Sequence, residues 1–222
     1  MKQYYPLFAD VDGRSCVVIG GGLIAQRKAT ALLRCGARIT VISPTVTRRL
    51  QRDAQRGALR HLPRRFRPAD LRGAWLVYAA TNDQRVNELV YQTATRQRIF
   101  TNVVDQKPLC SFIAPAIFRR GRLTMAISTG GASPTVAKRL KRELDSTIGS
   151  SYSQMLRLLA GLRGIAKRRL PSYQDRKRYF DALLDSPAFR LVREGRMAEA
   201  RRHALQLLNA QAHGNGHGAG RS

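Results

Sequence analysis

The sequence predicts an α/β protein in which a Rossmann-type parallel sheet is followed by a small α+β region and an all-helical C-terminal domain. Three observations carry this prediction. Apolar strand patterns alternate with helical patterns over the first half of the chain. A glycine-rich turn follows the first of these strands. From residue 151 onward, only helical periodicity is present.

The strands of the expected parallel sheet are short apolar runs separated by turn residues at Gly36, Gly57, Pro68 and Gly73. They cover residues 15–19, 38–42, 59–62, 75–80 and 99–104. Helical patterns lie between them at residues 24–35, 46–56 and 84–96. This alternation is typical of strands that run in parallel and are joined by crossover helices.

The pattern changes near residue 111. Two strands, 112–118 and 123–128, are expected to pair through a turn at 119–122. Ser133 is the expected N-cap of a helix that begins at Pro134 and carries an apolar seam. Further helices are expected at residues 155–165, 173–184, 188–193 and 197–208. The Gly- and His-rich residues after Asn209 are expected to be disordered.

The glycine-rich turn is the main functional signal. It follows the first strand and has the spacing Gly20-x-Gly22-x-x-Ala25. One glycine makes the tight turn, the next admits a pyrophosphate close to the backbone, and Ala25 lets the helix pack on the strand. The helix N-terminus then offers free N–H groups to phosphate. The alternative is a glycine-rich loop that binds no ligand.

The second strand ends at Ser43, Pro44 and Thr45, where nicotinamide enzymes of this fold usually have an acid for the ribose. No acid is present there. Ser43 or Thr45 would hydrogen-bond the ribose, whereas Arg48 or Arg49 would meet a 2′-phosphate. The choice between NAD and NADP is therefore open at this site.

Two more loops follow the carboxyl ends of expected strands, where ligands bind in open parallel sheets. The first of these loops contains Thr81, which we expect to face the cofactor. The alternative is an ordinary turn between strand and helix, in which Asn82 or Asp83 is the helix N-cap. Asp105 closes the second, and we interpret it as a general base, with a cap or turn residue as the alternative. A second anion site is expected at the helix start after Gly131.

The net charge of +26 has three interpretations, namely an exposed basic surface, a nucleic-acid partner or an acidic small-molecule substrate. Basic residues interleaved with aromatic ones, as in RNA-stacking modules, are not seen. No apolar run is long enough to span a bilayer and no signal-peptide pattern is present, so we expect a cytoplasmic protein without membrane contact. The cysteines and histidines are too scattered to predict a metal site.

Five motifs, taken in order, resemble the siroheme synthase N-terminal family, the precorrin-2 dehydrogenases and sirohydrochlorin ferrochelatases. They are Gly20-Gly21-Gly22, Ala80-Thr81-Asn82-Asp83, Asn102-Val103-Val104-Asp105, Ser111-Phe112-Ile113-Ala114-Pro115 and Ser128-Thr129-Gly130-Gly131-Ala132-Ser133-Pro134. Two further segments also fit, Tyr5-Pro6-Leu7-Phe8 and Ala25-Gln26-Arg27-Lys28-Ala29. The resemblance covers about residues 3–210.

The resemblance implies a homodimer and four regions, namely an NAD-binding Rossmann domain (1–113), a dimerisation region (114–150), a helical domain (151–210) and a disordered tail (211–222). Together with the loops above, it gives expected cofactor contacts at Gly20, Gly22, Leu23, Ile24, Ser43, Pro44, Thr45 and Thr81. Asp105 takes the position of the family's essential aspartate. Substrate contacts are expected at Asn102, Ser128, Thr129, Gly130, Gly131 and Ser133. Thr129 replaces a serine of the family motif.

The implied reaction is NAD-dependent oxidation of precorrin-2 to sirohydrochlorin, followed in some members by insertion of Fe²⁺, a second substrate, to give siroheme. Precorrin-2 is an anionic tetrapyrrole, and a basic cleft would bind its carboxylates through arginine. The alternatives are a dehydrogenase without chelatase activity, a Rossmann module that senses nucleotide without catalysis, and a nucleic-acid-binding protein. We expect no nucleic-acid partner.

Overall fold

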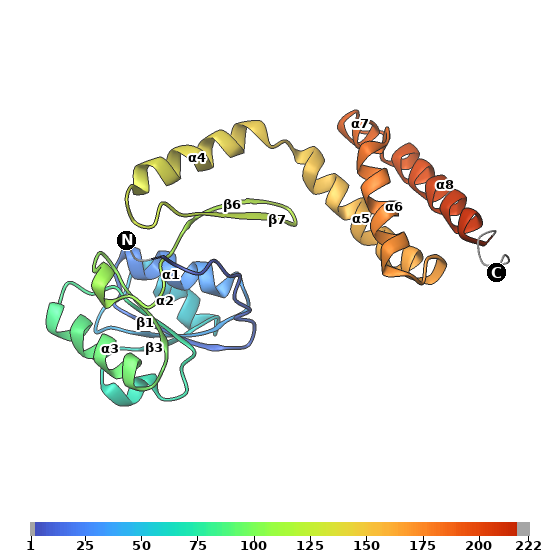
Figure 1. The fold of residues 1–222 in the computed structure, drawn as a ribbon. Helices are drawn as coiled ribbons and strands as arrows, with labels where there is room; N and C mark the ends of the chain where they lie inside the picture. Colours follow the sequence, from blue (N-terminus) through green and yellow to red (C-terminus); the bar gives the residue numbers. More distant parts are fainter. Residues whose placement is uncertain (1–2, 217–222) are drawn as a thin grey trace. The chain divides into compact units, whose positions relative to one another are not determined.

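A computed structural model describes residues 3–216 of the chain, which form two compact units (Figure 1). The first unit runs to Ala114 and also includes Gly130–Ala132. The second contains Pro115–Thr129 and the chain from Ser133 onward. The expected boundary between residues 113 and 114 lies one residue from this division. Residues 114–150 and 151–210 were expected to be separate regions. From Pro115 onward, nearly all residues of these two expected regions lie together in the second unit.

The first unit contains the expected parallel sheet. Its strands are β1 (Ser15–Ile19), β2 (Arg38–Ile42), β3 (Arg60–Leu62), β4 (Leu76–Ala79) and β5 (Phe100–Val103). All neighbours pair in parallel, in the order β3-β2-β1-β4-β5. The order reverses between β1 and β4, and in open parallel sheets such a reversal marks the place at the carboxyl ends of the strands where ligands bind. The predicted fold class is confirmed.

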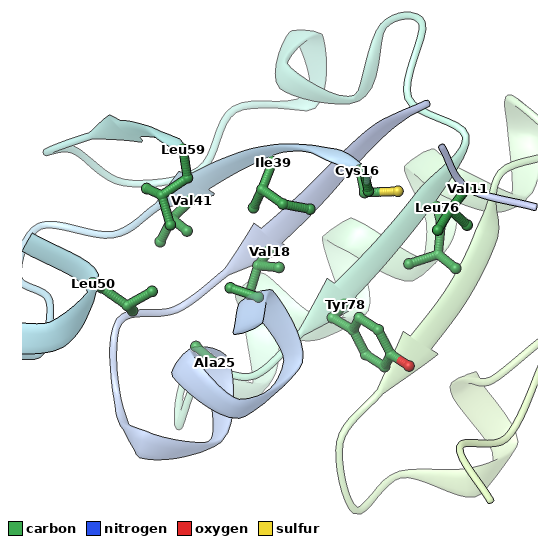
Figure 2. Packing of buried hydrophobic residues seen from close by; sticks show 12 residues of the cluster. Val11, Cys16, Val18, Ala25, Ile39, Val41, Leu50, Leu59, Leu76 and Tyr78 are labelled. Atoms are coloured by element: carbon green, nitrogen blue, oxygen red, sulfur yellow. The ribbon is translucent and has the colours of Figure 1, made fainter. Parts of the chain in front are cut away.

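Helices cover both faces of this sheet, which is why its central strands are apolar throughout. Cys16 and Val18 of β1 belong to the core that includes residues of α1 (Leu23–Leu33) and α2 (Arg48–Gln55), as Figure 2 shows. Val17 and Ile19 point the other way, into a core that includes residues of α3 (Gln84–Arg96). Successive side chains of a strand point to opposite faces, so a continuous apolar run fills both cores. Two short 3₁₀ helices complete the unit, η1 (Pro68–Leu71) and η2 (Lys107–Leu109).

The second unit begins with an antiparallel hairpin of β6 (Ala116–Arg120) and β7 (Leu123–Ile127). Five helices follow, α4 (Pro134–Thr147), α5 (Ser150–Arg169), α6 (Tyr173–Asp185), α7 (Ala188–Arg193) and α8 (Met197–Gly216). Helices α5 to α8 share one apolar core, in which the fully buried Tyr179 donates a hydrogen bond from its hydroxyl to Ala204 O at 2.9 Å. Within the described residues, no helix is long and apolar enough to cross a membrane.

The hairpin begins later than the sequence predicts. Residues 112–115 were expected in a strand, but β6 starts at Ala116. The Phe112 ring instead packs edge-on against Tyr78 and Phe100 of the first unit, at centroid distances of 5.4 and 6.3 Å. Pro115 also lacks the N–H that a paired strand requires. The aromatic contact and the proline therefore override the local strand pattern.

The C-terminal helix ends later than predicted. Residues after 209 were expected to be disordered, yet α8 continues to Gly216. The segment Ala210-Gln211-Ala212 has favourable helix propensities and extends a helix whose preceding turns are already packed by Ala204 and Leu208. The prediction was wrong for residues 210–216. Residues 217–222 of the expected tail lie outside the described part of the chain.

Candidate nucleotide and substrate site

The chain leaves β1 through three consecutive glycines, and each has a different reason to lack a side chain. Gly20 has a φ of +114°, and a Cβ there would overlap the carbonyl oxygen of Ala80. A Cβ on Gly21 would overlap the carbonyl oxygen of Thr45. A Cβ on Gly22 would meet nothing within 4 Å. The protein's own backbone therefore requires the first two glycines, whereas Gly22 faces open space of the kind a pyrophosphate would fill.

Helix α1 differs from α2 and α3, which also follow carboxyl ends of the sheet, in how its first turn is capped. The side chain of Thr47 accepts a hydrogen bond from Leu50 N at the start of α2. The side chain of Asp83 does the same for Val86 N at the start of α3. The N-cap of α1 is Gly22, which supplies no such bond. Because first-turn N–H groups have no partner within the helix, α1 keeps backbone donors for an anion.

The first two residues of α1 are both expected cofactor contacts. Leu23 is 70% exposed, and Ile24 is partly buried. Ala25, the next residue of the helix, is fully buried against the sheet, as the spacing of the motif predicts. The small Ala25 side chain brings the start of α1 close to the end of β1.

The loop after β2 is fastened to the glycine turn. Thr47 N donates to Gly21 O at 2.9 Å, and Thr47 Oγ1 donates to Gln26 Oε1 at 2.7 Å. The carbonyl oxygen of Ser43 lies 2.9 Å from His61 Nε2 on β3. Sequence patterns did not identify Thr47 or Gln26 as site residues, because a single hydroxyl and a single amide carry no recognisable spacing. These bonds bring the expected contacts Ser43, Pro44 and Thr45 beside the turn.

The expected ribose position has no carboxylate available. The first acid along the chain after this loop is Asp53 of α2, which is 2% exposed. It accepts hydrogen bonds from Arg49, at 3.0 Å, and from Arg56. Burial alone would raise the pKa of Asp53, but the hydrogen bonds and the positive charges of Arg49 and Arg56 together outweigh it, so the net shift of the pKa is downward. Asp53 is therefore neutralised within α2, and Arg48 lies exposed at the first position of that helix.

Thr81 is engaged within the loop that follows β4. Its hydroxyl lies 2.9 Å from Asn87 Oδ1 and accepts a hydrogen bond from Asp83 N at 3.2 Å. Asp83 caps α3, so the helix-cap interpretation of this loop is confirmed. The same loop lies against Gly20, because the Ala80 carbonyl occupies the space of a Cβ there. A cofactor contact by Thr81 stays a prediction.

Asp105 closes the loop after β5 at the same edge of the sheet. Its side chain is exposed, and its φ is +59°, a left-handed conformation that few residues other than glycine adopt. The adjacent Val104 N donates to Ala79 O at 2.9 Å, which ties this loop to the end of β4. Strained backbone of this kind is found at functional sites. The backbone of Asp105 is thus held at the carboxyl edge of the sheet by the surrounding fold.

Asn102, an expected substrate contact, is 8% exposed. Its amide Nδ2 donates to the carbonyl oxygen of Phe112 at 3.0 Å. This bond fixes the segment after η2, and no sequence pattern predicted it. A substrate contact by Asn102 stays a prediction.

The glycine turn before α4 is organised by its own side chains. Thr129 Oγ1 accepts from Ser133 N at 3.0 Å, and the Ser133 side chain accepts from Val136 N, which confirms the predicted N-cap. Gly130 and Gly131 both have positive φ, +62° and +84°. Lys107 Nζ donates to Gly130 O at 2.7 Å within the first unit. Ser128, Thr129 and Ser133 belong to the second unit.

Two other features bear on where ligands bind. A cavity of about 480 Å³ lies between α1 and α2, but it reaches Gly36 and Ala37 at the opposite end of the sheet from the glycine turn. It is therefore not the predicted nucleotide site. Among residues 3–216, no group of three or more His, Cys, Asp or Glu side chains is placed to hold a metal ion.

Three family models match successive parts of the chain. An NAD(P)-binding model matches residues 7–116. A model described as sirohaem biosynthesis protein central matches residues 120–147, and one described as sirohaem synthase dimerisation region matches residues 151–208. The dimerisation description thus falls on the helices after residue 150. The resemblance had led us to expect it on residues 114–150.

Two siroheme synthases are similar to nearly all of the chain. That of Thioalkalivibrio sulfidiphilus is 39% identical over 199 residues, which are 90% of this chain and 41% of the relative. Siroheme synthase 2 of Yersinia enterocolitica is 37% identical over 210 residues, 94% of this chain and 44% of the relative. The chain spans less than half the length of these relatives.

A solved structure named SirC, precorrin-2 dehydrogenase, is similar over its entire length. It is 32% identical to this chain and gives a TM-score of 0.78. The match covers 93% of this chain and 100% of that protein.

Proposed function

Because the chain belongs to the family of siroheme synthases and precorrin-2 dehydrogenases that includes SirC, we propose that it oxidises precorrin-2 to sirohydrochlorin with NAD. The observation that carries the proposal is the start of α1. There an uncapped helix N-terminus adjoins a glycine with open space around it, while α2 and α3 are capped by side chains. Free N–H donors and a close backbone approach are what a dinucleotide pyrophosphate requires.

The residues of this chain bind and orient the dinucleotide. In this proposal, backbone N–H groups of Leu23 and Ile24 hold the pyrophosphate, and the loop Ser43–Thr45 lies along the adenosine ribose. The hydrogen bonds of Thr47 to the glycine turn and to Gln26 keep that loop in place. When bound, NAD supplies the acceptor for a hydride. Because Asp53, the first acid after the loop that follows β2, is paired within α2, the ribose site does not select between NAD and NADP. The preference for NAD in this proposal therefore rests on the family alone.

Asp105 is the proposed general base. Oxidation of precorrin-2 removes a hydride and a proton, and the Asp105 carboxylate would accept the proton from the macrocycle. Its loop adjoins the end of β4 through the bond from Val104 to Ala79, which supports a place for Asp105 at the carboxyl edge of the sheet, where the nucleotide is proposed to bind. The left-handed φ of Asp105 sets the direction in which its Cα–Cβ bond leaves the backbone.

The charge of the protein suits an anionic tetrapyrrole. Precorrin-2 carries acetate and propionate groups, and a protein of net charge +26 raises the local concentration of such a ligand. Ser128, Thr129, Gly130, Gly131 and Ser133, around the start of α4, are proposed contacts for carboxylates of the substrate, and Asn102 of the first unit is proposed as a separate contact. Lys107 already donates to the Gly130 carbonyl, so it would place a cation beside that turn.

We propose a homodimer, since residues 151–208 match the dimerisation region of sirohaem synthases. Light scattering on the purified protein should give twice the monomer mass of 24.8 kDa. A monomer at micromolar concentration would contradict this proposal.

Iron insertion is a second candidate activity, with Fe²⁺ as substrate. It is favoured by the similarity to two siroheme synthases, whose named product contains iron. Incubation with sirohydrochlorin and Fe²⁺ in the absence of NAD tests it directly, because the absorbance spectrum changes on metal insertion. No acceleration over the protein-free reaction would leave a dehydrogenase without chelatase activity.

The dehydrogenase proposal is tested by NADH formation from precorrin-2, with Asp105→Asn as the variant. Asparagine tolerates the left-handed conformation of this position, so the substitution removes the charge with little backbone cost. We expect turnover to fall by roughly 100-fold or more, since general base catalysis contributes on that scale, while the Kd for NAD stays the same. Absence of NADH formation by the unaltered protein would overturn the proposed activity, and full turnover by Asp105→Asn would overturn the role of Asp105.

A further inference from the structure

The cavity between α1 and α2 is not used by the proposed function, and arginine side chains line it. Its volume of about 480 Å³ lies within the range of small-molecule binding sites. Three guanidinium groups surround it, that of Arg34 at the end of α1 and those of Arg49 and Arg56 at the start and end of α2. Asp53 is the one acid among the described lining residues, so the wall carries two net positive charges. A hollow with this excess of charge favours an anion.

The aspartate is buried beneath the arginines that it binds. The Asp53 side chain is 3% exposed, whereas those of Arg49 and Arg56 are 53% and 67% exposed. Asp53 Oδ2 accepts a hydrogen bond from Arg49 Nε at 3.0 Å, and Oδ1 accepts one from a terminal nitrogen of Arg56. The carboxylate thus fixes both guanidinium groups but uses only part of each. An arginine held in this way loses less freedom when it binds an oxyanion.

Further guanidinium donors around the cavity are available to a ligand. Within residues 3–216, Arg49 donates through Nε alone, so both of its terminal nitrogens lack a protein acceptor. The exposed Arg34 side chain makes no hydrogen bond or ion pair with any of the same residues. Planar guanidinium groups bind the oxygens of phosphate and carboxylate in pairs, so these donors suit an oxyanion.

Helix stability explains only part of this arrangement. Arg34 and Arg56 are the C-caps of α1 and α2, where positive charge is favourable. Arg49, however, lies in the first turn of α2, where the helix dipole disfavours a cation. Its pair with Asp53 places the cation four residues before the acid, which is the weaker order on an isolated helix. Because an apolar residue in place of Asp53 would cost little stability, the pair is better explained by a ligand of its arginines.

We propose that this cavity binds a small dianion with the chemistry of a phosphate ester or a dicarboxylate. Arg34 and Arg49 bind its oxyanion groups from the two helices, and Asp53 keeps Arg49 in place. The two net positive charges of the lining match the charge of such a ligand. Leu33 and Ala37 of the same lining offer apolar surface to its carbon atoms. Binding at this end of the sheet requires neither NAD nor the proposed dehydrogenase activity.

Isothermal titration tests the site with two probes, ribose 5-phosphate as the phosphate ester and succinate as the dicarboxylate. The salt concentration is about 150 mM, at which interactions with distant surface charges are largely screened. Each titration is repeated with saturating NAD, because NAD would displace a probe that occupies the glycine turn. The variants are Arg34→Gln and Arg49→Gln in the site and Asp53→Leu beneath it. Arg38→Gln is the matched control, since Arg38 follows the lining residue Ala37 but is exposed and does not line the cavity.

We expect at least one probe to bind with a Kd below about 1 mM that NAD does not change. Arg34→Gln and Arg49→Gln should each raise this Kd about tenfold or more, since each removes a charge-assisted hydrogen bond. Arg38→Gln should leave it within about twofold, because a screened surface charge contributes little. Asp53→Leu should raise it about threefold, because the arginines lose their anchor although the protein gains positive charge. The probe that binds more tightly distinguishes phosphate from carboxylate chemistry.

Four outcomes would overturn the proposal. They are no saturable binding of either probe, displacement of the probe by NAD, an equal loss of affinity in Arg38→Gln, and tighter binding by Asp53→Leu. The last two are what a diffuse positive field predicts, in place of a site built on a buried carboxylate. Melting temperatures without ligand show whether each variant is folded. If Asp53→Leu does not fold, Arg34→Gln and Arg49→Gln still decide the matter, because they alter exposed side chains.

Discussion

Gly22 is the position where one added methyl group should separate ligand binding from folding. Its φ of −79° and ψ of −173° are ordinary extended values that alanine adopts readily, and a Cβ there meets no protein atom within 4 Å. Gly22→Ala should therefore change the free energy of unfolding by less than about 1 kcal/mol, the small cost of alanine at an N-cap. In the NAD complex, however, the methyl group would stand where the pyrophosphate approaches the backbone.

The expected loss of affinity follows from the hydrogen bonds that this approach allows. Hydrogen bonds to a charged group contribute about 1.5–3 kcal/mol each, and a displaced pyrophosphate would lose at least one of them at the start of α1. Since about 1.4 kcal/mol is a factor of ten, the Kd for NAD should rise by about ten- to a hundredfold. Isothermal titration of NAD into the purified protein measures this change without any turnover.

Gly21→Ala is the matched control, one residue earlier in the same turn. A Cβ there would overlap the Thr45 carbonyl oxygen and come within 2.8 Å of Ser43 Oγ, so the loop after β2 must move. The bond from Thr47 N to Gly21 O would be disturbed as well. We expect unfolding to be easier by about 1–3 kcal/mol even without ligand, the usual cost of overpacking. A normal Kd for NAD in a stable Gly22→Ala protein would refute the placement of the pyrophosphate at this turn.

Three further substitutions test interactions that stabilise each unit from within. Tyr179→Phe removes the buried hydroxyl that donates to Ala204 O and should cost about 1 kcal/mol in urea unfolding, and no loss would mean that the bond is not formed in solution. Asp83→Ala should destabilise the protein by about 1 kcal/mol through the lost cap of α3, with Asp83→Asn as the control that retains a cap. The hydrogen bond from Arg64 holds the pKa of Asp70 below its usual value, so its stabilising contribution is present at neutral pH and is lost as the pH falls below about 4. Urea midpoints of Asp70→Asn should therefore fall short of those of the unaltered protein at neutral pH and converge with them in acid, and a constant difference across this range would contradict the shift.

The sheet was predictable because its signals are local. Each strand is a run of apolar residues bounded by turn residues, and β1 and β2 begin and end at the predicted positions. The N-caps Ser133 and Asp83 were also predictable, since a short polar side chain before a helical run satisfies a nearby backbone N–H. The predictions were wrong at the ends of elements whose limits depend on contacts with residues far away in the chain. Phe112 leaves its strand pattern to pack on Tyr78.

Local patterns were enough to predict the glycine turn, the crossover order of strands and helices and the position of Asp105 after β5. These follow from spacing and periodicity, which are written in neighbouring residues. Three other features emerge only in the folded chain: Gly21 is required by the Thr45 carbonyl, Asn102 holds the Phe112 segment, and the Lys28 ammonium lies over the Tyr78 ring. The physical reason is common to all three. Each depends on a contact between atoms that lie far apart in the chain, and no local pattern encodes which distant side chain will fill a given space.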